Sequence, residues 1–317
     1  MESKQFLMRK FLEYYRKADL KLPKSFEKRE FALVPFETLP EFIMHRHISF
    51  TSEEDFRSYA ISNVPAHVYY SSAYYQNPGK EKMEEKGWLG ADLIFDIDAD
   101  HLPLKTNSIE KVLEVAKREV KKLLKVLKLD FGINEAEVYF SGSRGYHVHV
   151  CEEEFLGLDS AERREIVDYL TINNPIIVQK KKLLDSNVAI RLSTYLKKKK
   201  KLEGKELLKM LKKPDEILEK FRIYIDAPVT ADVKRLIRMP GTLHGKTGLK
   251  VVRIEDLDSF EPLRDAIAFG EDKMKLRVLK KVRLRIGDKE LNLSQGEIAE
   301  IPEFAGIYLL CRGYATL

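Results

Sequence analysis

The segment LGADLIFDIDADHLP, residues 89–103, places aspartates at every second position behind an apolar run. The run predicts a β-strand, and because side chains alternate between the two faces of a strand, Asp96 and Asp98 share one face. Two neighbouring carboxylates raise each other's pKa unless a cation lies between them. A site for a hard divalent metal such as Mg²⁺ or Mn²⁺ would explain the pattern. By itself, D-x-D also fits a strand that runs into a solvated acidic turn.

The chain that follows this strand predicts a helix and two more strands. Residues 107–132 carry apolar residues at helical spacing, with Asn107 and Glu110 resembling a capping box and Gly132 at the end. EAEVYFSG (135–142) and YHVHVC (146–151) predict strands joined by a glycine-rich turn. The succession of strand, helix and strand predicts a crossover unit in an α/β core.

The remaining chain divides into two β-rich parts around a lysine-rich middle. Residues 158–222 have a helical texture with lysine runs at 180–182 and 197–201, and we expect a helical subdomain inserted between core segments 1–157 and 223–317. Helices are predicted at 5–17, 52–63 and 232–239, the last ended by Pro240. Strands are predicted at 29–36, 45–50, 66–75, 222–230, 276–286 and 306–315.

Composition narrows the class of protein. The 317 residues are 44% hydrophobic and 33% charged, which is typical of a globular protein and excludes a disordered one. Cys151 and Cys311 lie far apart, so neither a disulfide framework nor a zinc knuckle is expected. No signal peptide or apolar membrane span is recognisable, and we expect a soluble, cytoplasmic protein. The net charge of +6 suits a phosphate-bearing partner but is a mild signal.

A second constellation lies in SGSRGYHVHV, residues 141–150. Ser141, Ser143 and Arg144 occupy a glycine-flanked turn, and His147 enters the next strand. Glycines allow backbone amides to point at an anion, and an arginine fork suits phosphate oxygens. The alternative is a hairpin turn with an exposed arginine, and we prefer a purely structural role for His149.

A third constellation is ADVKRLIRMPGTLHGKTGL, residues 231–249. Asp232 could complete the metal site as a third carboxylate. Arg235 and Arg238 would lie one helical turn apart, and His244 and Lys246 occupy a glycine-flanked loop. Two arginines on a helix would usually be structural, but here Asp232 and the glycine-rich loop bracket them, which favours a triphosphate site. Carboxylates that hold metals beside cations that bind phosphates are the components of phosphoryl transfer.

These segments, together with REFAL (29–33), RHISF (46–50), YYSSAYYQNP (69–78) and LDSAERREI (158–166), resemble the small catalytic subunit of archaeal/eukaryotic-type DNA primase, in its archaeal form. The resemblance covers nearly the whole chain. It implies an α/β (α+β) primase catalytic fold, in which mixed β-sheets flanked by helices form a catalytic cleft, with an inserted helical subdomain.

The resemblance also assigns site residues. Asp96, Asp98 and Asp232 match metal-binding aspartates, and Arg46 matches a position near the incoming nucleotide. Asp100 is not carried over as catalytic. The matched phosphate contacts are Ser141, Arg144, His147, His244 and Lys246, with Arg238 as an addition.

The resemblance implies cofactors and partners as well. We expect two Mg²⁺ or Mn²⁺ ions, nucleoside triphosphates, a single-stranded DNA template, a large primase subunit in a heterodimer, and no membrane. Many archaeal relatives carry a cysteine-containing zinc knuckle after the D-x-D strand, but residues 101–120 contain no cysteine, so no structural zinc is predicted. The lysine runs are more simply solvated faces than a template track, because only Tyr195 lies close to them.

The sequence therefore predicts a DNA primase catalytic subunit that makes short primers by two-metal nucleotidyl transfer. One alternative is a repair or translesion polymerase of the same superfamily, which extends primers without starting them. Another is a non-catalytic regulatory subunit that binds nucleic acid, although the intact aspartates argue against it. A metal-dependent nuclease is a third, but Arg238, His244 and Lys246 suit a triphosphate better than a hydrolytic water.

Overall fold

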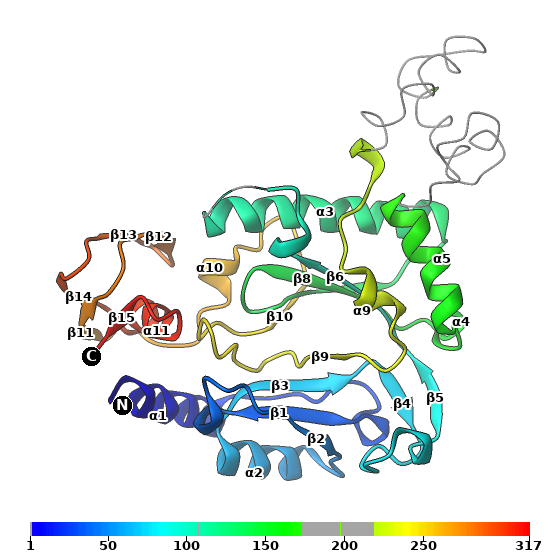
Figure 1. Cartoon of the computed structure of the whole chain (residues 1–317), viewed down its shortest axis with the longest axis horizontal. Coiled ribbons are helices and arrows are strands. Elements are labelled where there is room, and N and C mark those ends of the chain that lie inside the picture. The colour runs from blue at the N-terminus through cyan, green and yellow to red at the C-terminus, as the bar shows by residue number, and fades with distance from the viewer. Residues whose placement is uncertain (1, 105, 107, 173–196, 198–218) are drawn as a thin grey trace.

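The computed structural model describes residues 2–104, 106, 108–172, 197 and 219–317. Figure 1 shows two β-sheets with helix α3 on one outer side and α2 on the other, and a further β-rich part at the C-terminal end. The predicted α+β class, in which helices flank several β-sheets, is confirmed, and the described strand pairs within these sheets are antiparallel. Within the described residues, no helix is both long and apolar enough to cross a membrane.

The first sheet contains the aspartate strand and has the order β10-β7-β8-β6, with all neighbours antiparallel. Its strands are β6 (Leu93–Asp98), β7 (Ala136–Phe140), β8 (Gly145–Val150) and β10 (Val252–Ile254). Since β6 and β7 are both antiparallel to β8, they run in the same direction. The connection through α3 (Ile109–Asp130) is therefore the expected crossover, with β8 inserted between its two strands.

Helix α3 covers this sheet because one of its faces is apolar. Buried residues such as Val120 and Leu123 recur at helical spacing, and the helix packs against β6 and β8. Ser108 caps its first turn by accepting a hydrogen bond from the Lys111 amide, a role that the sequence had suggested for Asn107. Asn107 itself lies outside the described residues.

The second sheet has the order β2-β1-β3-β9, also antiparallel. Its strands are β1 (Phe31–Pro35), β2 (His45–Ile48), β3 (Pro65–Ser71) and β9 (Leu236–Arg238). Helices α1 (Glu2–Lys17) and α2 (Glu53–Asn63) bury Phe11 and Phe56 in the core that includes Phe31 of β1. Ser52 caps α2 as expected.

A small hairpin of β4 (Ala73–Tyr75) and β5 (Trp88–Ala91) follows the second sheet. A buried ion pair between Arg29 and Asp92 (2.7 Å) ties the start of β1 to the residue before β6. Helix α5 (Ser160–Thr171) is anchored nearby, because the buried Arg163 donates to the carbonyl oxygens of Ala91 and Asp92. Most of the predicted insertion, including both lysine runs apart from Lys197, lies outside the described residues, so the subdomain stays a prediction.

The C-terminal part combines two small sheets with a buried helix. The sheets have the orders β14-β11-β15 and β12-β13. Their elements are β11 (Lys273–Val278), β12 (Val282–Ile286), β13 (Lys289–Leu293), β14 (Ile298–Pro302), α11 (Glu303–Cys311) and β15 (Ala315–Thr316). The other short helices are α4 (Glu153–Leu156), α9 (Ala227–Ala231) and α10 (Pro262–Asp265), with 3-10 turns at Phe26–Lys28, Phe36–Thr38, Met83–Glu85 and Ala99–His101.

Two predictions beside the insertion are wrong. The expected helix at 232–239 is instead a turn followed by strand β9, which pairs with β3. Ile237 and Met239 are both buried, and burial at every second position is the pattern of a strand. The spacing of three residues between Arg235 and Arg238 had suggested a helix. The expected strand at 222–230 contains the short helix α9, which begins after Asp226 and has Pro228 in its first turn, where proline is favoured.

The strand predicted at 306–315 is also wrong, because most of it belongs to α11. The segment is apolar on every side, and a short apolar run cannot be assigned to helix or strand by periodicity alone. The helix is surrounded by core, and its residues from Phe304 to Leu310 are all buried. Only Ala315 falls in a strand, β15.

Candidate active site

The D-x-D strand is paired residue by residue with the strand that carries His147. Asp96 lies opposite His147 across β6 and β8, with Oδ1 of the carboxylate 3.7 Å from Nε2 of the imidazole. Asp98 lies opposite Gly145, where an added Cβ would be 2.4 Å from the carbonyl oxygen of Ile97. Glycine at 145 therefore lets β8 approach β6 closely next to Asp98.

A third carboxylate beside these two comes from Asp226, which the sequence analysis missed. The amide of Asp226 donates a 2.8 Å hydrogen bond to the carbonyl oxygen of Asp96. Burial, followed by the charges of Asp98 and Asp226, raises the pKa of Asp96 to about 7, while Arg235 and Arg238 lower it. The available signal in the sequence was an aspartate that precedes a helix with proline in its first turn, a common N-cap pattern.

The donor atoms at this cluster suit a hard divalent cation. Oδ1 of Asp98 is shielded from solvent and has no hydrogen-bond partner within the described part of the chain. The nearest cation to it is Arg144, at 3.8 Å, whose guanidinium also bonds Asp100 at 2.8 Å. No three His, Cys, Asp or Glu side chains of the described residues are grouped closely enough to bind a metal by themselves. Magnesium in phosphoryl-transfer sites typically takes one or two carboxylates and completes its shell with phosphate oxygens and water, so the donors fit such an ion.

Two loops that were predicted to bind phosphate pack against each other. The Thr247 hydroxyl donates to the carbonyl oxygen of Gly142 (2.6 Å), and a Cβ on Gly142 would lie 2.8 Å from Cβ of His244. The turn residue Ser141 is buried, and Lys246 is exposed with its amide donating to Nδ1 of His244 (3.2 Å). The structure therefore brings the 141–145 and 244–248 loops together.

Arg238 is held in place by two residues of β3. Its Nη1 lies 2.8 Å from the Tyr69 hydroxyl and 2.7 Å from Nδ1 of His67, whose ring meets that of His244 edge-on at 4.8 Å. Burial, then the charges of Arg238 and Lys246, lowers the pKa of His67 to about 2. His67 is thus a neutral acceptor for the guanidinium, and the sequence analysis missed it.

The two histidines of β8 have different surroundings. Burial, then Arg238 and Arg235, lowers the pKa of His147 to about 3, so this ring is neutral beside Asp96. His149 is packed against Tyr139, with ring centroids 4.6 Å apart, and its Nδ1 lies 3.3 Å from the Tyr70 hydroxyl. These contacts agree with a structural role for His149.

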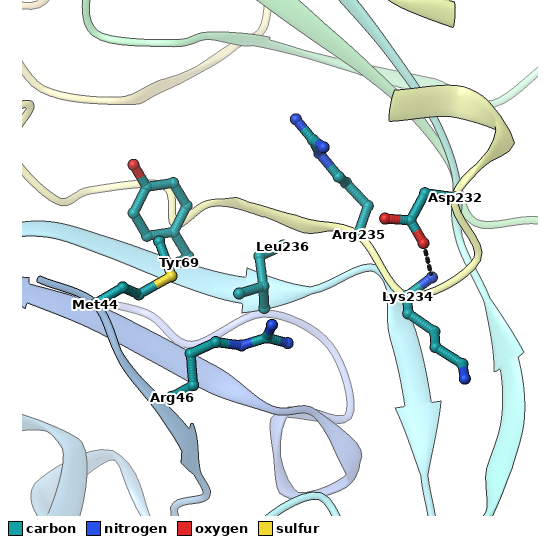
Figure 2. A pocket seen from close by; sticks show the side chains of 7 residues that line it. All are labelled: Met44, Arg46, Tyr69, Asp232, Lys234, Arg235 and Leu236. Carbon is teal, nitrogen blue, oxygen red and sulfur yellow. Dashed lines mark hydrogen bonds between the residues drawn. The ribbon is translucent and has the colours of Figure 1, made fainter. Parts of the chain in front are cut away.

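Asp232 and Arg46 lie in a separate surface groove, shown in Figure 2. Oδ1 of Asp232 accepts a hydrogen bond from the Lys234 amide (2.9 Å), and Nε of Arg46 bonds the buried Glu30 (3.0 Å). We call this feature the basic groove, and it is lined by Met44, Arg46, Tyr69, Asp232, Lys234, Arg235 and Leu236.

Comparisons with known proteins agree on one family. The family described as "DNA primase small subunit" matches residues 95–256, which include the aspartate strand and both loops. The DNA primase small subunit PriS of Archaeoglobus fulgidus is 57% identical over 100% of this chain and 99% of its own length. Those of Methanococcoides burtonii and Thermoplasma volcanium are 35% and 39% identical, over 99% and 96% of this chain and 98% and 95% of their own lengths.

The matches are long and include the segments that build the site. Each of these three relatives aligns over nearly the full length of both chains. The segment matched by the family begins at Phe95, so it includes Asp96 and Asp98, and it continues past Lys246. The chain therefore belongs to the DNA primase small-subunit family, and it is a nucleotidyltransferase that catalyses primer synthesis.

Proposed function

We propose that this chain starts primers on single-stranded DNA from nucleoside triphosphates, with Asp96, Asp98 and Asp226 as the carboxylates of a two-metal site. Membership of the family implies catalysis with divalent ions. The position of Asp226 beside Asp96 carries the proposal, because burial, followed by the charges of Asp98 and Asp226, raises the pKa of Asp96, and a bound divalent cation would offset that effect. We assign Mg²⁺ or Mn²⁺ because every donor is a carboxylate oxygen.

When bound, such ions would orient the attacking 3′-hydroxyl and draw negative charge from the triphosphate. Asp96 and Asp98 on β6, and Asp226 directly before α9, would hold them. The hydrogen bond from the Asp226 amide to the Asp96 carbonyl oxygen fixes the start of α9 against β6. The chain thereby presents its carboxylates before substrate arrives, which lowers the reorganisation needed in the transition state.

Cationic and neutral donors of the two loops and of strands β8 and β9 would bind the triphosphate. His147 stays neutral over the physiological pH range and can donate a hydrogen bond without adding charge beside Asp96. The Arg238 guanidinium, oriented by His67 and Tyr69, would neutralise the leaving pyrophosphate. The other proposed nucleotide contacts are Ser141, Arg144, His244, Lys246 and Arg46.

Asp232 was the expected third carboxylate, and we propose Asp226 in its place. Asp226 is hydrogen-bonded to Asp96, and its charge acts on the Asp96 carboxylate. Asp232 lines the basic groove, with one carboxylate oxygen engaged by the Lys234 amide.

Family membership implies a large-subunit partner and DNA. A heterodimer with that subunit and the absence of a structural zinc remain proposals.

The test is synthesis by the isolated chain without a primer. Single-stranded DNA, labelled nucleoside triphosphates and Mg²⁺ or Mn²⁺ are combined, and products are resolved by length. We expect new labelled oligomers that disappear with Asp98→Ala, a variant expected to stay folded. Full activity of Asp98→Ala would refute the assignment of the site. Extension of a supplied primer without new starts would instead favour the repair-polymerase alternative or a requirement for the large subunit.

A further inference from the structure

We propose that the basic groove binds the single-stranded template, with Lys234 and Arg235 contacting its phosphates and Trp88 stacking on a base. This inference rests on the proposed function, because it names where that reaction holds its template. It is carried by three features of the described residues: the charge of the groove, the exposed Trp88 side chain beside it, and its proximity to Asp96.

The groove is basic, and two of its cations are free to bind a ligand. Its lining contains three cationic side chains and one carboxylate, that of Asp232. Arg46 is already paired with Glu30, but neither Lys234 nor Arg235 forms a salt bridge within the described part of the chain. In Figure 2 the side chains of Arg235 and Lys234 point in opposite directions from the chain. Cations without intramolecular partners can exchange their counterions for backbone phosphates.

Exposed aromatic residues neighbour residues that line the groove. The Trp88 indole nitrogen donates a hydrogen bond to the carbonyl oxygen of Val233 (3.2 Å), the residue between Asp232 and Lys234 in the chain. Trp88 is nevertheless 37% exposed. Phe42, 36% exposed, lies two residues before the groove residue Met44 in the chain, and its ring packs on that of His67, with centroids 5.3 Å apart. Aromatic side chains alternating with cations are the arrangement by which proteins bind single strands, because every base offers a face for stacking.

The groove lies beside the candidate active site. The charge of Arg235 acts on the Asp96 carboxylate, and Tyr69 bonds Arg238. A strand in the groove would therefore pass close to the proposed reacting groups. A protein partner would be better served by a larger contiguous apolar patch, whereas four of the seven lining residues, Arg46, Asp232, Lys234 and Arg235, are charged. Single-stranded nucleic acid fits the pattern better.

The experiment uses Trp88 as its own reporter, since it is the chain's single tryptophan. The full chain is titrated with fluorescently labelled oligo(dT) of about 12 nucleotides, within the range that single-strand sites cover, in EDTA and without nucleotides. We expect Trp88 fluorescence to be quenched in parallel with the rise in DNA anisotropy. An abasic oligomer of equal length, which keeps the phosphates, should bind more weakly and leave the fluorescence nearly unchanged.

Three variants separate stacking from charge. Trp88→Ala should weaken binding about tenfold, as expected for loss of one stacked base, and Trp88→Phe should restore most of it. Lys234→Ala should reduce the slope of log affinity against log salt by about 0.7, the value for one phosphate contact on a single strand. Lys275→Ala is the matched control, because Lys275 is exposed on β11, at the far end of the molecule from β5 in Figure 1.

Two results would overturn the proposal. The first is DNA binding by anisotropy without quenching of Trp88, or no binding at all. The second is Trp88→Ala and Lys234→Ala proteins that bind like Lys275→Ala. Because the titration contains neither metal nor nucleotide, its failure would leave the primer-synthesis assay unaffected, and the two proposals can fail separately.

Discussion

The backbone amide of Asp226 donates a 2.8 Å hydrogen bond to the carbonyl oxygen of Asp96, which joins the residue before α9 to the middle of β6. The two residues are far apart in the sequence, and the intervening chain includes the crossover helix α3. The bond places a third carboxylate beside the D-x-D pair, where its charge contributes to the raised pKa of Asp96. This contact distinguishes Asp226 from Asp232 as the candidate metal ligand.

Replacement of each aspartate by asparagine tests this distinction. Asp226→Asn should reduce primer synthesis by about 100-fold or more, the usual loss when a group that stabilises the transition state is removed. Asp232→Asn should reduce primer synthesis by less than about tenfold, because the Asp232 carboxylate is engaged by the Lys234 amide at the basic groove. Both rates are measured at saturating nucleotide and metal, with circular dichroism as the check of folding. The reverse ranking would restore Asp232 as the third ligand.

The raised pKa of Asp96 predicts how the metal-free protein responds to pH. The folded protein keeps a proton on Asp96 up to about pH 7, whereas the unfolded chain loses it near pH 4. The folded state then binds more protons between these values, so the contribution of Asp96 to stability falls as the pH rises from about 4 to about 7. In EDTA, Asp96→Asn should therefore melt at a higher temperature than the wild type above pH 7, with the difference shrinking towards pH 4. A difference in melting temperature between the two proteins that is the same at every pH would contradict this.

The affinity for a divalent metal should rise with pH, whereas the contribution of Asp96 to stability falls with pH. A metal ion binds the ionised carboxylate, so the proton on Asp96 competes with it below about pH 7. Calorimetric titration with Mn²⁺ should give an affinity that rises by up to about tenfold per pH unit between 5 and 7 and then levels off, with proton release over the same range. An affinity independent of pH in this range would show that Asp96 is not a ligand.

Gly145 should be required for the geometry of the carboxylates. In Gly145→Ala the new Cβ would lie 2.4 Å from the Ile97 carbonyl oxygen, forcing β8 away from β6. We expect a loss of about 1–3 kcal/mol in the free energy of unfolding, typical of overpacking, together with reduced primer synthesis. Gly157→Ala is the control, because nothing lies within 4 Å of the Cβ it would add. Equal stability of the two variants in urea denaturation would contradict the prediction.

Lys246 should act mainly in nucleotide binding. Its side chain is exposed at the end of the loop that packs on the 141–145 turn, and no proposed metal ligand contacts it. Lys246→Ala should raise the KM for nucleoside triphosphate by about tenfold with a smaller effect on kcat, as for loss of uniform binding. Steady-state kinetics on a supplied primer measure both constants. An unchanged KM would remove Lys246 from the nucleotide site.

Several features of this protein could be predicted from local sequence. The alternation in ADLIFDID defines strand β6 and puts Asp96 and Asp98 on one face, and the helical period of residues 109–130 defines α3. The glycines around Arg144 predict a tight turn, which the structure has between β7 and β8. These signals are local because side-chain period and turn chemistry depend on residues only a few positions apart.

Other features depend on segments that meet only in the folded chain. Residues 236–238 form a strand because β3 offers them a partner, and α11 is a helix because the surrounding core accepts apolar side chains on every side. The basic groove exists only where β2, β3 and the chain before β9 lie together. Asp226 joins Asp96 through a backbone hydrogen bond that no side-chain pattern encodes. The sequence by itself thus determined the strands, turns and residue types from which the site is made, whereas tertiary pairing decided which carboxylates and cations share it, because charge interactions depend on distance in space and not along the chain.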